Sequence, residues 1–429
     1  MKKIYISSNL ENMTIALQES IDYAIKNKLH LVIRKGIYNI TPIFIKGKLR
    51  MTFEDGVILR GITDESLYPL IETRVAGIEM KWYPALLNII DTNNVIIDGR
   101  GIIDGCGEYW WQKYWGNDQK GGMRKEYDAK GLRFLCDYDC MRPRNILIQN
   151  SSKIKIFDVT SRNSGFWNIH ILYSNNILIN NVKIDSSAIN SPSTDGIDID
   201  SSAYVKIINV KTSCNDDSIC IKSGRDSDGI RVNRPSHHIY IESCEILKGF
   251  GITIGSEVSG GIHDVYIKNI IYKGTDCGFR IKSSQPRKGY IKNIYLSNLT
   301  MIDVKYLFHI YLNWNPLYSI CSMPDDFKGE MLPHYKVLTT KTSGENTNID
   351  NIYIKNVTAT LSNDYKGIAR AFMIVGFEDR HIKNIYFKNV SITAFEYGKI
   401  EYVDNLSHIN FKINAMGAFD KANDDYDNR

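Results

Sequence analysis

Four short polar motifs lie between Ser193 and Lys282, inside a long run of β-branched residues, and three of them bring acids or cations together. Asp195 and Asp216 are 21 residues apart, close to one repeat of the surrounding pattern. They can therefore lie side by side on neighbouring parallel strands, whose backbones are roughly 4.8 Å apart. Clustered carboxylates repel one another, so the pKa of at least one rises. That carboxyl can donate a proton while its neighbours stay ionised, the division of labour that glycoside hydrolysis requires.

Asp217 follows Asp216 directly, and adjacent residues of a regular strand face opposite ways. The two acids can share one surface only where the backbone turns. Taken alone, this pair fits a turn as well as a site, because Asp is common in β-turns. We interpret four other nearby acids as turn residues or solvated ones: Asp198, Asp200, Asp226 and Asp228.

Arg280 and Lys282 are two residues apart in a predicted strand, so their side chains lie on one face. A paired arginine and lysine beside a groove suit a substrate carboxylate, which arginine can bind through two parallel hydrogen bonds. The combination of three acids and two cations therefore indicates a sugar substrate that carries a carboxylate, that is, a uronic acid.

A repeat of strand, polar turn and strand surrounds these motifs. Each unit opens with a polar residue, often asparagine, as at Asn94, Asn145, Asn176, Asn293, Asn351 and Asn384. Units that follow one another directly are 23 residues (154 to 177), 26 residues (239 to 265) or 29 residues (265 to 294) apart. Propeller blades need about 40 residues or more, so this period favours a single-stranded right-handed parallel β-helix over a propeller or sandwich.

The same pattern gives a structural role to five asparagines, which can stack and hydrogen-bond on successive coils: Asn180, Asn181, Asn269, Asn356 and Asn389. Near the start of the chain, apolar residues at helical spacing predict a helix over 12–27 that caps the open end of the stack. We expect one domain over 1–429, interrupted by loop insertions at 61–92, 105–135 and 314–346. Aromatic residues in these insertions are expected mainly to cover a core edge. The polar tail, 414–429, is expected to be poorly ordered.

Charge and composition exclude several classes of protein. With 53 Lys+Arg against 48 Asp+Glu the net charge is +5, too small and dispersed for a nucleic-acid-binding surface. The sequence contains no apolar run long enough to span a membrane, and its first residues resemble no signal peptide. We therefore expect a cytoplasmic protein, or a periplasmic or secreted one if a leader was removed. The eight cysteines lack zinc-site spacing and are expected to be free thiols.

The motifs as a set resemble glycoside hydrolase family 28, the polygalacturonase family, whose pattern is Asn-Thr-Asp-Gly, a paired Asp, Gly-His-Gly and Arg-Ile-Lys. The corresponding segments here are Thr194-Asp195-Gly196, Asp216-Asp217, Gly249-Phe250-Gly251 and Arg280-Ile281-Lys282. The resemblance implies a parallel β-helix that hydrolyses α-galacturonosyl bonds in pectic polysaccharide with inversion and without a metal or other cofactor. By position, Asp216 is then the general acid, Asp195 and Asp217 hold and activate water, and Arg280 and Lys282 bind galacturonate.

Two positions depart from the family pattern. Ser193 stands where the family usually has asparagine, and Phe250 replaces the family histidine with a group that can neither hydrogen-bond nor carry charge. Phe250 can instead form an apolar wall or stacking face, which makes a rhamnogalacturonan substrate an alternative to galacturonan. A family tyrosine downstream of the cationic motif corresponds weakly to Tyr311.

Two other functions fit the same architecture. A calcium-dependent pectate lyase is also a parallel β-helix with acids and an arginine, and a non-catalytic β-helix could bind carbohydrate without cleaving it. Among hydrolases, the long insertions can close one end of a groove, and Gly224-Arg225-Asp226 with Ser256-Glu257 resembles the bacterial exo-acting branch. The sequence therefore favours an exo-acting hydrolase.

Overall fold

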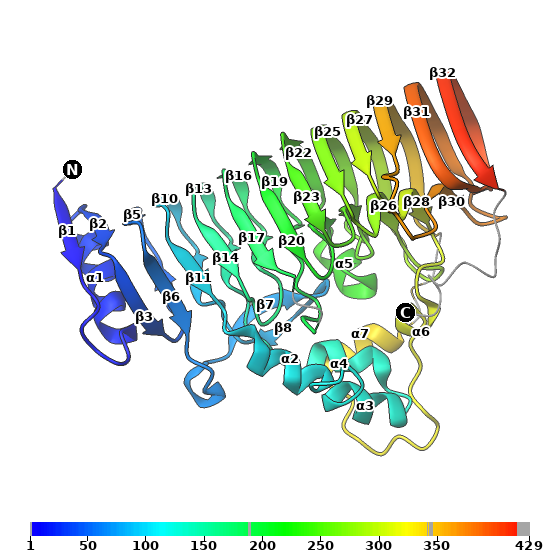
Figure 1. Cartoon of the computed structure of the whole chain (residues 1–429). Coiled ribbons are helices and arrows are strands. Elements are labelled where there is room, and N and C mark those ends of the chain that lie inside the picture. The colour runs from blue at the N-terminus through cyan, green and yellow to red at the C-terminus, as the bar shows by residue number, and fades with distance from the viewer. Residues whose placement is uncertain (1, 188–189, 341, 343–345, 418–429) are drawn as a thin grey trace.

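A computed structural model describes residues 2–187, 190–340, 342 and 346–417. The chain forms a right-handed parallel β-helix, as predicted, and the described residues contribute 30 strands to one continuous sheet. Successive coils are stacked from β1 at the N-terminal end to β32 at the other (Figure 1). No helix in the described ranges is long and apolar enough to cross a membrane.

Each coil contributes a strand to two or three parallel stacks. The first stack contains β1 (Lys3–Ile6), β2 (His30–Ile33), β5 (Leu49–Phe53), β10 (Asn93–Gly99), β13 (Ser152–Phe157), β16 (Asn175–Asn180), β19 (Ala203–Ile208), β22 (Ser236–Glu242), β25 (Ile262–Lys273), β27 (Tyr290–Ile302), β29 (Asn348–Thr360), β31 (Ile382–Glu401) and β32 (Val403–Gly417). The second contains β3 (Gly36–Ile40), β6 (Val57–Gly61), β11 (Ile102–Asp104), β14 (Thr160–Arg162), β17 (Lys183–Ser186), β20 (Lys211–Cys214) and β23 (Glu245–Lys248), and it continues into β25.

The third stack positions the predicted site. It contains β4 (Ile43–Ile45), β9 (Leu87–Ile90), β12 (Ile146–Gln149), β15 (Ile169–Leu172), β18 (Ile197–Asp200), β21 (Ile219–Lys222), β24 (Ile252–Ile254), β26 (Cys277–Lys282), β28 (Tyr306–Tyr311) and β30 (Arg370–Val375). Isoleucines occupy the inward positions and align from coil to coil, as Ile197, Ile219 and Ile252 do. All three are fully buried, so the register keeps one apolar column inside the coil and turns the alternate residues outward.

The N-terminal helix is confirmed: α1 (Thr14–Lys26) buries Leu17, Ile21 and Ala24 over the first coil. The asparagine ladder is confirmed for Asn269, Asn356 and Asn389. Asn180 accepts a 3.2 Å bond from Asn209, whereas Asn181 donates to Asp158 at 2.6 Å and not to another asparagine. Side-chain amides link Asn269, Asn298, Asn356, Asn389 and Asn410 in turn at 2.8–3.0 Å. Every one of them has a positive φ of 50–58°, a conformation that asparagine tolerates better than most residues.

The three insertions contain ordered elements, which corrects the prediction that they are loops. Residues 61–92 form η1 (Glu65–Leu67) and an antiparallel hairpin of β7 (Ile71–Val75) and β8 (Ile78–Trp82) before β9 resumes the coil. The second insertion forms α2 (Gly107–Trp115), α3 (Gly122–Ala129) and α4 (Arg133–Asp139), and the third forms α6 (Pro316–Ser319) and α7 (Pro333–Thr339). A further helix, α5 (Asp226–Val232), follows β21.

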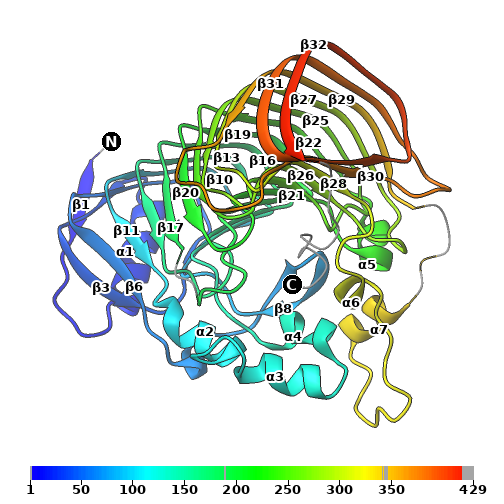
Figure 2. The same cartoon turned by 45° about the vertical axis from the view of Figure 1, so that its right-hand side comes forward.

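Burial of aromatic rings explains why the second insertion forms regular structure, since Trp110, Trp111 and Tyr114 of α2 are almost wholly buried. Figure 2 shows α2, α3, α4, α6 and α7 gathered on one side of the coil stack. The predicted tail begins too early, because β32 continues the ladder to Gly417. Residues 418–429 lie outside the described part of the chain.

Candidate active site

The predicted acids come together at one corner of two successive coils. Asp195 lies two residues before β18, Asp217 two residues before β21, and Phe250 two residues before β24, and the ladder aligns these strands. The sequence spacing predicts Asp216 as the neighbour of Asp195, whereas the register places Asp217 opposite it. A hydrogen bond from the Gly196 amide to the Asp217 carbonyl, 2.8 Å long, fixes that pairing.

Asp217 is held by cations. Its two carboxylate oxygens contact the Arg280 guanidinium and, at 2.9 Å, the Lys282 ammonium, and Thr253 donates a hydrogen bond of 2.9 Å. Burial alone would raise the pKa of Asp217, but Arg280 and Lys282 bring the pKa well below its usual range. Asp217 is therefore an ionised carboxylate near neutral pH.

Asp216 and Asp195 have the opposite tendency. Burial, and then the negative charge of Asp217, raise the pKa of Asp216. Burial, followed by the charges of Asp216 and Asp198, raises the pKa of Asp195 well above its usual range. Both acids line the cleft described below, whereas the side chain of Asp217 is fully buried beside them. The group thus combines one permanent carboxylate with two carboxyls that can hold a proton.

Arg280 and Lys282 lie on one face of β26, as the sequence predicts, but their role in the structure is to hold Asp217. The Arg280 guanidinium lies 4.7 Å from the centre of the Phe250 ring, which covers it. The Lys282 ammonium lies 4.5 Å from the centre of the Trp314 ring. Of the two cations, Lys282 is among the residues that line the cleft.

Of the two remaining predicted residues, Ser193 lines the cleft and Tyr311 does not. Ser193 lines the cleft next to Asp195, and its hydroxyl accepts a 3.3 Å hydrogen bond from Arg142. Tyr311 pairs with Lys282 in the ladder between β26 and β28, and its ring packs 6.0 Å from that of His309. Tyr311 is not one of the described residues that line the cleft, so its assignment stays a prediction.

Lys222 was missed by the sequence interpretation. Its ammonium is 3.1 Å from Glu257, 3.7 Å from Asp198 and 4.0 Å from Asp195, and the side chain is only 5% exposed. The pKa of Lys222 is raised well above its usual range, because neighbouring anionic groups, Glu257 among them, outweigh the effect of burial. The available signal was its place in Ile219-Cys220-Ile221-Lys222, where alternation turns Lys222 to the same outward face as Cys220.

The interpretation of four acids as turn or surface residues is wrong. Asp198 and Asp200 are fully buried, and their side chains face outward from β18. Asp226 and Asp228 belong to α5 and are only 6% and 7% exposed. Three of them neutralise buried arginines: Arg74 contacts Asp200 at 3.0 Å and Asp228 at 3.9 Å, and Arg287 contacts Asp226 at 3.0 Å. The insertions cover these positions, which is why acids on the outer face of a coil are buried.

The cleft above the acids has a volume of about 590 Å³ and is walled by all three insertions. Ala76, at the tip of the β7–β8 hairpin, forms part of one wall, and Trp115, Trp314 and Tyr318 form others. The hairpin tip is fixed in place: the Tyr138 hydroxyl donates to the Ala76 carbonyl at 3.0 Å, and the Arg225 amide donates to the Gly77 carbonyl at 2.8 Å. The hairpin tip is therefore a fixed part of the cleft wall.

A metal ion fits this site poorly. In the described ranges, one group brings three possible ligand atoms within 4.8 Å of one another: Asp195, Asp217 and Cys220. Arg280 and Lys282 already neutralise Asp217, and burial raises the pKa of the Cys220 thiol well above its usual range. Calcium prefers six to eight oxygen ligands, so this donor set does not suit it.

A sequence model of Glycosyl hydrolases family 28 matches residues 43–324, which include all the acids and both Arg280 and Lys282. The chain belongs to glycosyl hydrolase family 28. A probable polygalacturonase of Vitis vinifera is 34% identical over 229 residues, 53% of this chain and 43% of that protein. An exo-poly-alpha-D-galacturonosidase of Dickeya chrysanthemi is 25% identical over 319 residues, 67% of this chain and 52% of that protein. The chain thus spans about half the length of these relatives, or less.

Solved structures of the family share the fold. The exopolygalacturonase of Thermotoga maritima superimposes with a TM-score of 0.74 at 24% identity, covering 96% of this chain and 92% of that one. The family 28 exopolygalacturonase of Yersinia enterocolitica gives a TM-score of 0.77 at 18% identity, covering 98% of this chain and 76% of that one. Both comparisons agree with the β-helix described above.

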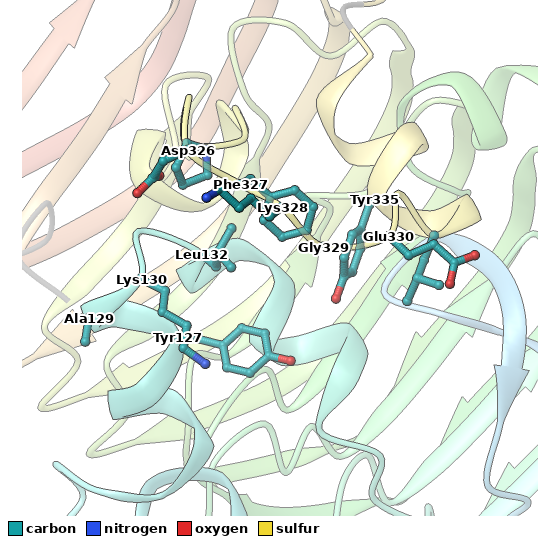
Figure 3. Close-up of a pocket in the computed structure, with 12 residues that line it drawn as sticks. Tyr127, Ala129, Lys130, Leu132, Asp326, Phe327, Lys328, Gly329, Glu330 and Tyr335 are labelled. Carbon is teal, nitrogen blue, oxygen red and sulfur yellow. The ribbon is translucent and has the colours of Figure 1, made fainter.

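A second hollow, of about 700 Å³, lies between the two helical insertions and shares no lining residue with the family's candidate active site (Figure 3). Tyr127 lines it from α3, Phe327 from the segment before α7, and Tyr335 from α7. The hydroxyls of Tyr127 and Tyr335 both donate to one carboxylate oxygen of Asp139, at 2.8 and 2.5 Å. These bonds hold the two insertions together, and the hollow lies apart from the catalytic candidates.

Proposed function

We propose that this family 28 protein is an inverting hydrolase that cleaves α-galacturonosyl bonds in pectic galacturonan. The observation that carries the proposal is the division among three adjacent acids: the cations lower the pKa of Asp217, while the pKa values of Asp195 and Asp216 are raised. Hydrolysis of a glycosidic bond needs one protonated and one ionised carboxyl at the same time.

The productive state carries one proton, on Asp216, and leaves Asp195 and Asp217 ionised. Asp216 passes its proton to the glycosidic oxygen as the bond to the sugar breaks. Asp195 and Asp217 hold a water molecule that attacks the sugar carbon from the opposite side, which inverts the configuration. The proton of that water passes to Asp195, which lines the cleft and, with its raised pKa, is the stronger base of the two.

The charges of the cleft support an acidic sugar as the substrate. Lys282 lines the cleft, whereas Arg280 is 3% exposed and lies beneath Phe250, so an incoming carboxylate meets Lys282 first. Arg280 then contributes positive charge from below and keeps Asp217 ionised. Relatives that are named polygalacturonases support galacturonan over rhamnogalacturonan as the substrate.

The three insertions that wall the cleft support attack at chain ends, although both exo- and endo-acting enzymes occur among the relatives. The hairpin tip at Ala76–Gly77 lies across the cleft wall, and Gly77 has a φ of +84° with Arg225 packed against it. A side chain added at Gly77 would strain the backbone and meet Arg225 at 2.6 Å. We expect Gly77→Val to displace the tip, so that products from galacturonan change from short end fragments to a mixed ladder. An unchanged profile in a folded variant contradicts the exo assignment.

The test of the catalytic proposal is Asp216→Asn, with Asp185→Asn on the exposed face of β17 as the matched control. Loss of the general acid should lower kcat on galacturonan about 10²- to 10⁴-fold with an unchanged fold, and the control should keep full activity. Proton NMR of the first product should show the inverted anomer. Near-normal turnover by Asp216→Asn refutes the assignment.

The same preparation separates the two alternative functions. A calcium-dependent lyase would lose activity in chelator and form unsaturated products that absorb in the ultraviolet. A non-catalytic binding protein would retain oligogalacturonate without shortening it. Activity in chelator, without new ultraviolet absorbance, excludes both.

A further inference from the structure

Four side chains of the metal-binding type form a two-by-two group on the outer face of β22 and β25, outside the cleft. They are His237 and His238 on one coil and His263 and Asp264 on the next, and the ladder pairs His237 with His263. We call this group the histidine grid. No member lines the candidate active site.

The backbone explains why neighbours in sequence lie side by side. His238 has a φ of +53° and Asp264 a φ of +56°, so the usual alternation of a strand is broken at both coils. As a result the Nδ1 atoms of His237 and His238 are 2.8 Å apart, and His263 Nδ1 is 2.8 Å from an Asp264 carboxylate oxygen. His238 Nδ1 lies 4.0 Å from the same oxygen of Asp264, which connects the two coils.

The grid is open to solvent and carries suitable charges. The side chains of His238, His263 and Asp264 are 37%, 21% and 24% exposed. The Asn293 side-chain amide donates a 3.0 Å hydrogen bond to the Asp264 carboxylate oxygen that does not contact His263. A neutral imidazole and an ionised carboxylate are the forms that bind metals.

We propose that His237, His238 and Asp264 bind a divalent transition-metal ion of the zinc type, with His263 orienting the Asp264 carboxylate. Imidazole and carboxylate ligands suit zinc, which takes four tetrahedral ligands at about 2.0–2.2 Å. Such bonds set ligand atoms roughly 3.3 Å apart. Two of the three spacings are 2.8 and 4.0 Å, and the third, between His237 and Asp264, exceeds 4.8 Å.

Binding requires the side chains of His237 and Asp264 to approach each other. Among the described residues only the group at Asp195 now has three ligand atoms within 4.8 Å of one another, so the grid closes by ring rotation when the ion enters. His263 has the position of an outer partner that fixes a ligating carboxylate. The proposal is independent of the proposed hydrolysis, because the grid shares no residue with the cleft.

The test titrates zinc chloride into the full chain, free of any affinity tag, by calorimetry at pH 7.5. Wild type should bind one equivalent, and cobalt substituted for zinc should give the visible absorption of a tetrahedral site. His238→Asn and Asp264→Asn each remove a ligand and should weaken binding at least about ten-fold; His263→Asn should weaken it by about ten-fold. Asparagine is a safe replacement, because Asn293 and Asn351 occupy the same rung on later coils with the same positive φ.

His381→Asn is the control, since His381 makes an isolated 2.8 Å contact with Asp404 on another coil. It should leave zinc affinity unchanged. Absence of zinc binding by wild type overturns the proposal and leaves the grid as a stack of imidazoles, two of which are 5.0 Å apart and nearly parallel. Binding that persists unchanged in both ligand variants also overturns it and places the ion elsewhere.

Discussion

Replacing Lys222 by methionine removes the one ammonium that faces three buried acids. Lys222 lies 3.1 Å from Glu257, 3.7 Å from Asp198 and 4.0 Å from Asp195, and all four side chains are at most 5% exposed. Methionine has a similar length and needs no partner, so the change mainly removes charge. The three buried carboxylates then lose a cation that lies within 4.0 Å of each.

Breaking a buried ion pair by removing one partner costs about 3–5 kcal/mol, because the remaining charge is neither solvated nor neutralised. The cost should depend on pH. The pKa of Glu257 is lowered below its ordinary 4.5: burial raises it, and Lys222 first among the cations brings it down. A carboxylate of this kind stabilises the fold above its unfolded pKa, and the contribution is lost as the pH falls through the folded pKa. Without Lys222 the largest part of that contribution is lost, while Arg287 and Lys282 keep a smaller part, so the deficit is largest near pH 7 and narrows in acid.

Urea unfolding of wild type, Lys222→Met and the double variant Lys222→Met/Glu257→Gln, at pH 7 and at pH 3, below the ordinary pKa of glutamate, measures this effect. Removing the Glu257 charge should restore about 0.5–3 kcal/mol of the loss at pH 7. Lys155→Met is the matched control, because Lys155 is an exposed residue of β13 and should change stability little. A deficit that is equal at both pH values, or additive in the double variant, refutes the charge argument.

Three further outcomes follow from the described contacts. Arg280→Gln removes a cation that lowers the pKa of Asp216, so the pKa of this general acid rises and the basic limb of the kcat/KM profile should move to higher pH; an unmoved limb contradicts this. Phe250→Leu keeps an apolar wall but loses the cation–π contact with Arg280, which is worth about 0.5–2 kcal/mol. The kcat/KM on galacturonan should therefore fall about 2- to 30-fold, and an unchanged kcat/KM contradicts a role for the ring. Asn356→Ala breaks two ladder bonds at a φ of 55° and should lower stability by about 1–3 kcal/mol in thermal unfolding, with Asn356→Gly recovering the backbone part.

The repeat of the sequence was sufficient to predict the coil. Inward isoleucines and turn asparagines recur at one coil length, so each local preference agrees with the global fold, and both the helix over the first coil and the ladder through Asn356 follow from that. The helices and the hairpin of the insertions could not be predicted from the repeat, because the insertions have no repeating pattern of their own. Trp110 and Trp111 order α2 through burial against the coil, a contact that no spacing reveals.

The sequence by itself placed the acids, Phe250 and the pair of Arg280 and Lys282 at one corner of successive coils, because motifs one repeat apart must align in a parallel stack. Only the tertiary structure decided which groups are neutralised and by what. Arg280 and Lys282 contact Asp217, and the covering insertions bury Lys222 and Asp198 on what would otherwise be an outer surface. Proton affinity depends on burial and on charges within a few ångströms, and those distances are set by segments far apart in the chain.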